Sequence, residues 1–287
     1  MLSKKIIVLF DEYGNHTFNL KSNRIFVGVS AIYELEDEED IFKKSDKIMG
    51  LSKSKPLKND KINVSKAITI SNELIKYPIE IDVRFINLDD SILINNLDNY
   101  KAFGDYTRKE YRGITKERKY AQILYPQLVE TCLFSSISHF LEHNTEDIYD
   151  IEICVDNWEY PIPDIDLALK YASEKLELSI SDLMNKFKIN SIVTISNKQL
   201  LKDISSERKR FIDVITSVIS KNFRDHNDKT YSSKPLEILT KGMGNKIRVE
   251  DSTEDSTAET SNSFYDSIVN NVEETRNKDN KIMLINN

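Results

Sequence analysis

Two aspartates each follow a short apolar run in the chain. Asp11 follows residues 6–10 (IIVLF), and Asp156 follows residues 151–155 (IEICV). Runs of this length and composition predict strands that are buried on both faces. A carboxylate at the end of such a strand is held in place by the rigid sheet while the strand end opens to solvent. We therefore interpret Asp11 and Asp156 as candidate ligands of a divalent metal ion and as candidate catalytic residues.

A third carboxylate is needed for the chemistry that this pattern favours. Hydrolysis of a phosphodiester by two metal ions requires three or four carboxylates around Mg²⁺ or Mn²⁺ ions about 4 Å apart. Asp213 is the candidate, because it lies in a predicted helix but off its apolar stripe, beside Thr216, Ser217 and Ser220. This line of short side chains is either an ordinary solvent face or a surface that lets substrate or metal approach closely. We favour the second interpretation.

Four further residues are weaker candidates. Glu12 could assist a water molecule or a second ion, but successive strand residues point to opposite faces unless the turn has already begun. Asp89 and Asp90 also end an apolar segment and are the reserve pair should Asp156 take no part. Lys58 could contact a substrate phosphate as a point charge, although a loop lysine is more often only solvated.

The leading acids also have an ordinary interpretation as turn residues. Gly14 and Asn15 favour a turn after Asp11 whatever its function, and Asn157 gives Asp156 a turn-forming neighbour. For Asp11 the position after a strand favours the functional interpretation, whereas for Asp156 the two interpretations stay evenly balanced.

Other motifs give little support to a different chemistry. His139 and His143 have an i,i+4 spacing that suits a metal, but histidine is also favoured at the end of a helix by the helix dipole. The sequence contains no Walker loop, GxGxxG or GxSxG motif, which argues against a nucleotide-binding loop and a serine nucleophile. Cys132 and Cys154 lack metal-ligand spacing, and we expect them to be buried free thiols.

The composition is that of an ordinary globular chain. No apolar run in the 287 residues reaches the roughly 18 residues that cross a bilayer. Residues 6–10 meet two acids rather than a cleavage site, so we expect a cytoplasmic protein with no membrane partner. The net charge of −7 gives no bulk argument for nucleic acid, but residues 43–66 hold eight lysines and residues 101–119 hold seven Lys or Arg. These segments either form a phosphate-binding face or only keep the chain soluble.

The predicted elements form an α/β protein. Their order is strands at 5–10, 16–20 and 24–33, helices at 36–48 and 64–76, a strand at 79–88, a helix at 116–143, a strand at 151–155, helices at 164–176 and 179–187, a strand at 189–195 and a helix at 206–223. We expect the first three strands to form an antiparallel meander, followed by alternating helices and strands in a mixed sheet with helices on both faces.

This succession is the order of the ribonuclease H fold. We assign that fold to residues 1–224, with insertions near 50–76 and 89–115. Residues 225–287 are expected to be a polar, acidic extension that is partly disordered or a short helix, because residues 250–274 contain eight acids and no base.

The segments around the acids resemble a known family. VLFDEYGNHTF (residues 8–18), followed by RIFVGVSAIY (residues 24–33), resembles the opening of the family called domain of unknown function number 3800. That family begins with a strand, an Asp-Glu-Ser-Gly turn and a second apolar strand block, and here Tyr13 stands where Ser is usual. PLKNDKI, ICVDNWE and RFIDVITSVISKNF resemble its later motifs, although the last one lacks the usual Gln and Ala. They single out Lys58, Asp156 and Asp213.

The resemblance implies a ribonuclease H-like fold and a nuclease that depends on Mg²⁺ or Mn²⁺ and acts on DNA or RNA. Several members are associated with mobile elements and anti-phage systems, so it also implies the effector of a defence system, with a protein partner or a second copy of the chain. The rival hypothesis is a non-catalytic ribonuclease H-like scaffold or a regulatory subunit of a multiprotein complex. The altered motifs and the acidic residues 250–274, which could dock on a basic partner, motivate it.

Overall fold

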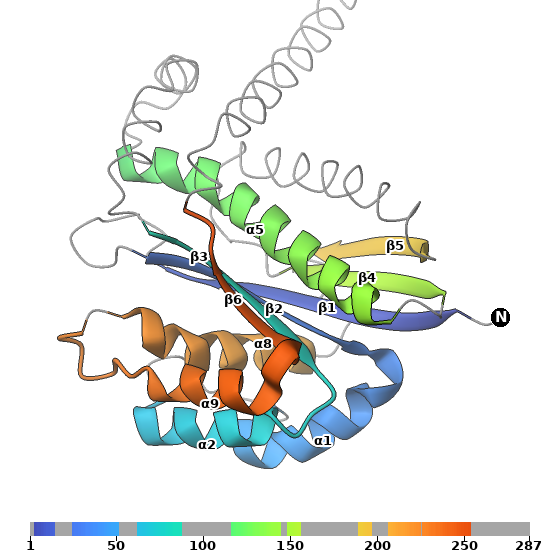
Figure 1. Cartoon of the computed structure of the whole chain (residues 1–287), viewed down its shortest axis with the longest axis horizontal. Helices are drawn as coiled ribbons and strands as arrows, with labels where there is room; N and C mark the ends of the chain where they lie inside the picture. The colour runs from blue at the N-terminus through green and yellow to red at the C-terminus, as the bar shows by residue number, and fades with distance from the viewer. Residues whose placement is uncertain are drawn as a thin grey trace, which may run out of the picture.

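The chain folds into a mixed sheet with helices on both faces (Figure 1). The computed structural model describes residues 3–14, 25–51, 62–87, 116–144, 148–155, 189–196, 206–224 and 226–253. Within these ranges no helix is both long enough and apolar enough to span a membrane. The α/β class predicted from the sequence is confirmed.

The strands lie in the order β5-β4-β1-β2-β3-β6. Their bounds are β1 (Lys4–Tyr13), β2 (Ile25–Glu34), β3 (Glu80–Asn87), β4 (Tyr149–Val155), β5 (Ile189–Ser196) and β6 (Ile247–Asp251). β2 pairs antiparallel with β1 and β3, whereas β4 is parallel to β1, β5 to β4 and β6 to β3. Of the six described strands, β2 therefore runs against the other five. β1 is central and covered on both faces, which explains why all of residues 6–10 are apolar and buried.

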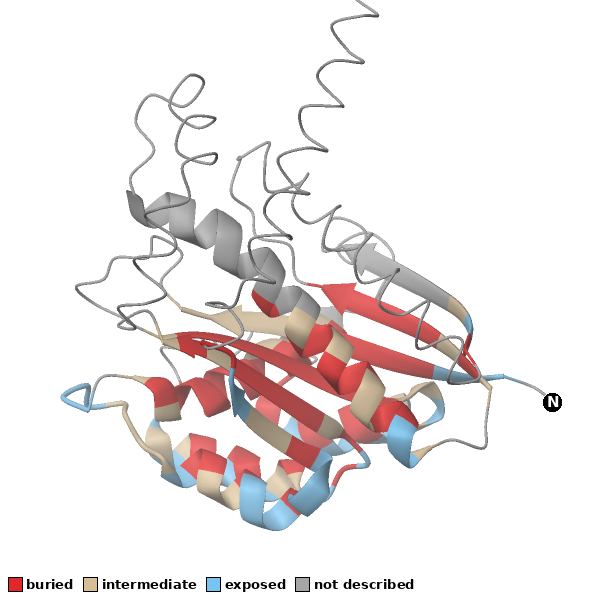
Figure 2. Cartoon of the chain, turned by 45° about the horizontal axis from the view of Figure 1, so that its top comes forward, coloured by how far each residue is buried: buried red, intermediate tan, exposed pale blue. Residues whose placement is uncertain are grey.

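The helices form one layer on each side of the sheet. α5 (Lys116–His143) covers one face, and α1 (Glu38–Met49), α2 (Val64–Leu74), α8 (Ser206–Ile219) and α9 (Lys234–Met243) cover the other (Figure 1). The described residues also include the short 3-10 turns η1 (Leu35–Asp37), η3 (Ser220–Phe223), which continues α8, and η4 (Gly244–Lys246). A large core cluster joins the sheet to the four-helix layer, and Figure 2 shows buried residues concentrated along the strands and the inner helix faces.

Local chemistry fixes two of the helix ends. Asn63 precedes α2, and its Oδ1 accepts a hydrogen bond from the backbone N–H of Lys66 at 2.8 Å. Gly50 ends α1 with φ at 68°, in the left-handed region that glycine adopts without steric cost. Its N–H donates to the carbonyl of Asp46 at 2.7 Å.

The structure confirms most of the predicted elements within a few residues, including the long helix at 116–143. The predicted strand at 16–20 and the helices at 164–176 and 179–187 lie outside the described residues. The expected meander is different, because β1 pairs directly with β2 and the third antiparallel strand is β3, which follows two helices. Cys132 and Cys154 are free and buried, as predicted, and burial raises the pKa of Cys154 to about 11.

The fold also continues past the boundary expected near residue 224. α9 packs against α2, and β6 extends the sheet beside β3. The polar composition of this region hid an amphipathic helix that buries one face, formed by Pro235, Leu236, Leu239 and Met243. Residues 234–251 therefore belong to the same folded unit as the sheet.

Candidate active site at the end of the central strand

Asp11 lies inside the central strand rather than in a turn. β1 continues to Tyr13, and Asp11 pairs with Val29 of β2. The strand predicted at residues 5–10 therefore continues three residues further, because β2 is long enough to pair with β1 as far as Tyr13. The side chain of Asp11 is half-buried.

The pleat of β1 decides which face Asp11 occupies. Ile7 and Leu9 belong to the core cluster that also contains Phe211 and Ile215 of α8. Side chains alternate along a strand, and β1 keeps one register with β2 from Ile6 to Tyr13. Asp11 therefore points to the same face as Ile7 and Leu9, which is the face that α8 covers.

Glu12 points to the other face. It pairs with Gly28 of β2, and residues directly opposite each other in a ladder share a face. A Cβ atom at Gly28 would lie 3.0 Å from Cγ of Leu128 in α5 and 3.1 Å from the ring of Phe10. Glu12 is thus on the α5 side, where its Oε2 is buried. The strand continues through residue 12, so Asp11 and Glu12 do not share a face.

β1 and β4 bring the sequences around two of the predicted acids together. The two strands are parallel and in register, and Phe10 pairs with Val155. Phe10 is the residue before Asp11, and Val155 is the residue before Asp156. Asp156 itself lies outside the described residues, as do Lys58 and the reserve pair Asp89 and Asp90.

Asp213 lies on α8, the helix that packs over β1. It is half-buried. The small residues beside it are buried: Thr216 is 3% exposed, Ser217 6% and Ser220 0%. An ordinary solvent face for this line of residues is therefore excluded. Oγ1 of Thr216 is buried and makes no hydrogen bond with the described residues, so polar groups are enclosed beside Asp213.

A buried ionic network fixes α8 against the sheet. Arg208 on α8 donates from Nη1 to Oε1 of Glu152 at 2.5 Å and from Nε to Oε2 of Glu38 at 2.6 Å. Tyr33 donates from its hydroxyl to Oε2 of Glu38 at 2.8 Å, and Lys5 pairs with Glu152. Burial alone would raise the pKa of Glu152, but hydrogen bonds and charge from Lys5 and Arg208 hold the pKa below its usual range. This network keeps the carboxylate of Glu152 ionised and ties α8 to β2, β4 and α1.

Two basic residues in η3 and directly after it, Lys221 and Arg224, were missed by sequence reasoning. Lys221 is completely buried, and its Nζ makes no hydrogen bond with the described residues. Burial and the charge of Arg224 lower the pKa of Lys221 to about 8, against an opposing effect of Asp228. The guanidinium of Arg224 lies 5.5 Å from the ring centre of Tyr13. The sequence did contain a signal that Lys221 is buried. It lies three residues after Val218 and seven after Val214, so helical spacing places it on the same side as these two apolar residues.

The donor types at this site suit a hard divalent cation. Carboxylate oxygens are the ligands that Mg²⁺ and Mn²⁺ prefer. Among the described residues, no group of three His, Cys, Asp or Glu side chains is arranged to hold a metal ion. Asp11 and Asp213 belong to the described residues and Asp156 does not, so any set that includes all three extends beyond them.

Comparison with known proteins gave no match, either to a family model or to a curated protein sequence. What can be inferred about this site therefore depends on its own residues.

Proposed function

We propose that this chain is a Mg²⁺- or Mn²⁺-dependent nuclease with a ribonuclease H-like fold, which hydrolyses phosphodiester bonds of DNA or RNA. In the proposed site Asp11, Asp156 and Asp213 bind the metal. A defence effector is the role that the family resemblance suggests for such an enzyme. The observation that supports the proposal most directly is the parallel pairing of Phe10 with Val155, the residues that precede Asp11 and Asp156.

The sheet topology supports the proposed fold. β2 pairs antiparallel with β1 on one side and with β3 on the other, and β4 and β5 then follow in the chain, both parallel to β1 on its other side. Apart from the two helices between β2 and β3, this order is the one expected of a ribonuclease H-like protein. The connections place α8, the last helix of that succession, on the face to which Asp11 points.

The placement of Asp11 and Asp213 supports the proposed chemistry. A bound divalent ion would activate water and stabilise the charge that develops on the phosphate. Asp11 would hold such an ion at a fixed position, because β1 is hydrogen-bonded on both sides up to Phe10. Asp213 would approach from α8, whose position is fixed by Arg208. Since Glu12 lies on the α5 face, we propose that metal ligation involves the α8 face alone and that any part of Glu12 is indirect.

Positive charge lies beside the same end of β1. Arg224 contacts the ring of Tyr13, two residues after Asp11. It also lies 3.6 Å from a carboxylate oxygen of Asp228, whose exposed side chain screens part of its charge. A guanidinium at this position could contact a phosphate that flanks the scissile bond.

Cleavage assays on the full chain test the proposal. Labelled single- and double-stranded DNA and RNA are incubated with the protein in Mn²⁺, in Mg²⁺ and in chelator. We expect metal-dependent cleavage that falls at least about 100-fold in Asp11→Asn and in Asp213→Asn, because each substitution removes a charged ligand. Asp150→Asn is the matched control, since Asp150 lies at the opposite end of β4, and it should retain cleavage.

A second readout does not depend on turnover. Mn²⁺ should raise the unfolding temperature of the unmodified chain, and Asp11→Asn should abolish most of that rise. Cleavage that is unchanged in Asp11→Asn would remove the proposal. The absence of both cleavage and Mn²⁺ stabilisation, in a folded chain, would favour the non-catalytic scaffold.

A further inference from the structure

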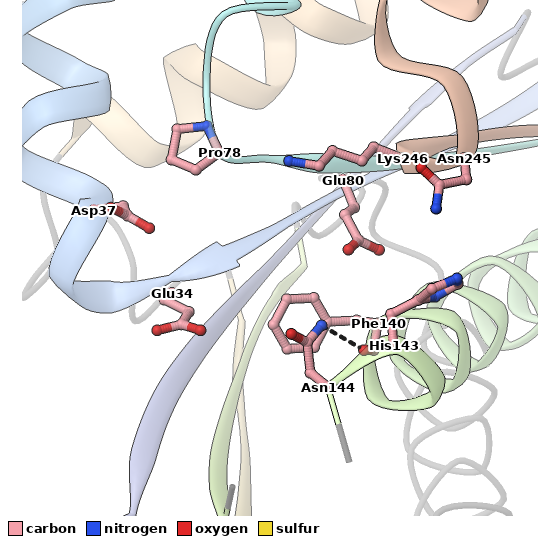
Figure 3. A pocket seen from close by; sticks show the side chains of 9 residues that line it. All are labelled: Glu34, Asp37, Pro78, Glu80, Phe140, His143, Asn144, Asn245 and Lys246. Carbon is pink, nitrogen blue, oxygen red and sulfur yellow. Dashed lines mark hydrogen bonds between the residues drawn. The ribbon is translucent and has the colours of Figure 1, made fainter. Parts of the chain in front are cut away.

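A pocket lies at the other end of the sheet from Asp11, on the α5 side. Its volume is about 280 Å³, and its lining includes Glu34, Glu80 and Phe140 (Figure 3). Glu34 pairs with Ile6 of β1, five residues before Asp11. Five residues of a strand span roughly 17 Å, so this pocket is separate from the proposed nuclease site.

Glu80 has one buried carboxylate oxygen that accepts no hydrogen bond from the described residues. Its carboxylate points into the pocket (Figure 3), and its Oε2 is buried with no hydrogen-bond partner among the described residues. Burial raises the pKa of Glu80, against lowering effects of His139, His143, Lys246 and Arg248. A desolvated carboxylate oxygen without a donor is costly to maintain, so a ligand that donates to it would be favoured.

Three side-chain donors near Glu80 bind other groups. Nε2 of His139 lies 2.7 Å from the carbonyl oxygen of Asn245, and Nδ1 of His143 lies 2.9 Å from that of His139. A carbonyl can only accept, so each of these ring nitrogens donates. Asn144 likewise donates from Nδ2 to the carbonyl of Phe140 at 2.8 Å. These groups bind backbone carbonyls at the end of α5 or next to it, and they leave Glu80 unsatisfied.

The electrostatic character of the pocket favours a cation. Glu34, Asp37 and Glu80 contribute three carboxylates, and Lys246 is the lysine among the described lining residues. Burial also raises the pKa of Glu34, against the charge of Lys4. In addition α5 ends at His143, and the C-terminal end of a helix carries negative partial charge that attracts cations.

An organic cation suits the pocket better than a metal ion. Among the described residues no three His, Cys, Asp or Glu side chains are arranged for metal binding. The ring of Phe140 on one side of the pocket and Pro78 on another supply apolar surface for carbon atoms. The volume lies just below the roughly 300–1,000 Å³ of pockets that hold drug-sized ligands, so the ligand must be small.

We propose that this pocket binds a small organic cation with N–H donors, a primary amine or a guanidinium, whose charged group donates to Glu80 while its carbon chain contacts Phe140. This site is independent of the proposed nuclease site, and neither proposal requires the other.

Calorimetric titration of the full chain with agmatine and with putrescine tests the proposal, with 1,4-butanediol as the uncharged probe. We expect both amines to bind and the diol not to bind. Glu80→Gln should weaken the binding of the amines at least about tenfold, because it removes a charged acceptor. Glu39→Gln, which removes an exposed carboxylate of α1 that does not line the pocket, should leave binding unchanged.

The pH dependence and a second variant complete the test. Since the cation favours the ionised carboxylate, binding should tighten as the pH rises through the raised pKa of Glu80 and should then level off. Lys246→Met should tighten binding, because it removes an exposed cation from the lining and should leave the fold intact. Failure of both amines to bind would overturn the proposal. An affinity for the amines in Glu80→Gln equal to that of the unmodified chain would also overturn it. If Glu80→Gln does not fold, an affinity in Lys246→Met that is no higher than in the unmodified chain would overturn it instead.

Discussion

Nη1 of Arg208 on α8 lies 2.5 Å from Oε1 of Glu152 on β4 and donates a hydrogen bond to it. The same guanidinium binds Glu38 of α1 through two further hydrogen bonds. All three side chains are largely buried, with 8%, 9% and 19% of the side chain exposed for Arg208, Glu152 and Glu38. This contact ties the helix that contains Asp213 to the strand that ends immediately before Asp156.

Arg208→Met should destabilise the protein strongly. The substitution leaves Glu38 and Glu152 buried without their shared cation, and removing one partner of a buried ion pair costs roughly 3–5 kcal/mol. We expect a loss near the lower figure, because Lys5 still pairs with Glu152. Urea unfolding at pH 7 measures it. Lys44→Met, which breaks the exposed pair with Asp40, should change stability by no more than about 0.5 kcal/mol. Equal effects of the two substitutions on the free energy of unfolding would contradict the stabilising role given to the buried pairs of Arg208.

Lys221→Met should stabilise the protein near neutral pH. The ammonium of Lys221 is buried without a hydrogen-bond partner among the described residues, and its removal should add roughly 1–3 kcal/mol to the free energy of unfolding. The folded pKa is about 8 and the unfolded pKa is about 10.4, so the unfolded chain binds more protons between these values. The stability of the unmodified chain should therefore rise with pH across this window. Unfolding curves from about pH 7 to pH 10.5 test whether Lys221→Met flattens that rise. A Lys221→Met variant that is less stable than the unmodified chain at pH 7 would show that the buried ammonium does not destabilise the fold.

Gly28→Ala should push α5 away from the sheet. The new methyl group would lie 3.0 Å from Cγ of Leu128 and 3.1 Å from the ring of Phe10. Overpacking of this kind costs roughly 1–3 kcal/mol. The cost should fall when Leu128 is shortened to Ala, so a double-mutant cycle should show a favourable coupling between the two substitutions. Strictly additive effects would mean that Leu128 is not the obstacle.

Removal of the residues after Arg224 should disrupt the folded unit. The truncation deletes α9, with its buried Leu236 and Leu239, and deletes β6 from the sheet edge. β3 would then present unpaired backbone groups, which promote association between chains. We expect aggregation or loss of cooperative unfolding, measured by size-exclusion chromatography and circular dichroism. A chain that ends after Thr253 keeps both elements and should elute without aggregates and unfold in a single transition. A monomeric, cooperative chain ending at Arg224 would refute this prediction.

Much of the sheet could be predicted because its strands have the simplest sequence signals. The apolar run at residues 6–10 and the alternation at residues 79–88 each predict a strand, and β1 and β3 are found there. The pairing of these strands could not be predicted in the same way. Nothing local in residues 24–33 shows that this segment pairs on one edge with β1 and on the other with β3, because pairing depends on contacts distant in sequence.

The site shows the same division between local and distant information. The helical wheel identified Asp213 as lying off the apolar stripe, but it could not show that Thr216 and Ser217 beside it are buried. The Gly14–Asn15 signal predicted a turn but not its start, because the length of β2 determines how far β1 continues. Lys221 was missed because a lysine is normally assigned to the surface, and here tertiary packing encloses it.

The pleat of β1 has a consequence for how the molecule tolerates change. Displacement of β1 by a single residue would turn Asp11 toward α5. It would also move every apolar side chain of the strand to the opposite face of the sheet, where the neighbouring side chains are packed around a different one. The apolar residues 6–10 thus hold Asp11 on its face of the sheet without contacting any ligand. Substitutions that let this strand slide would impair whatever Asp11 does while leaving Asp11 itself in the sequence.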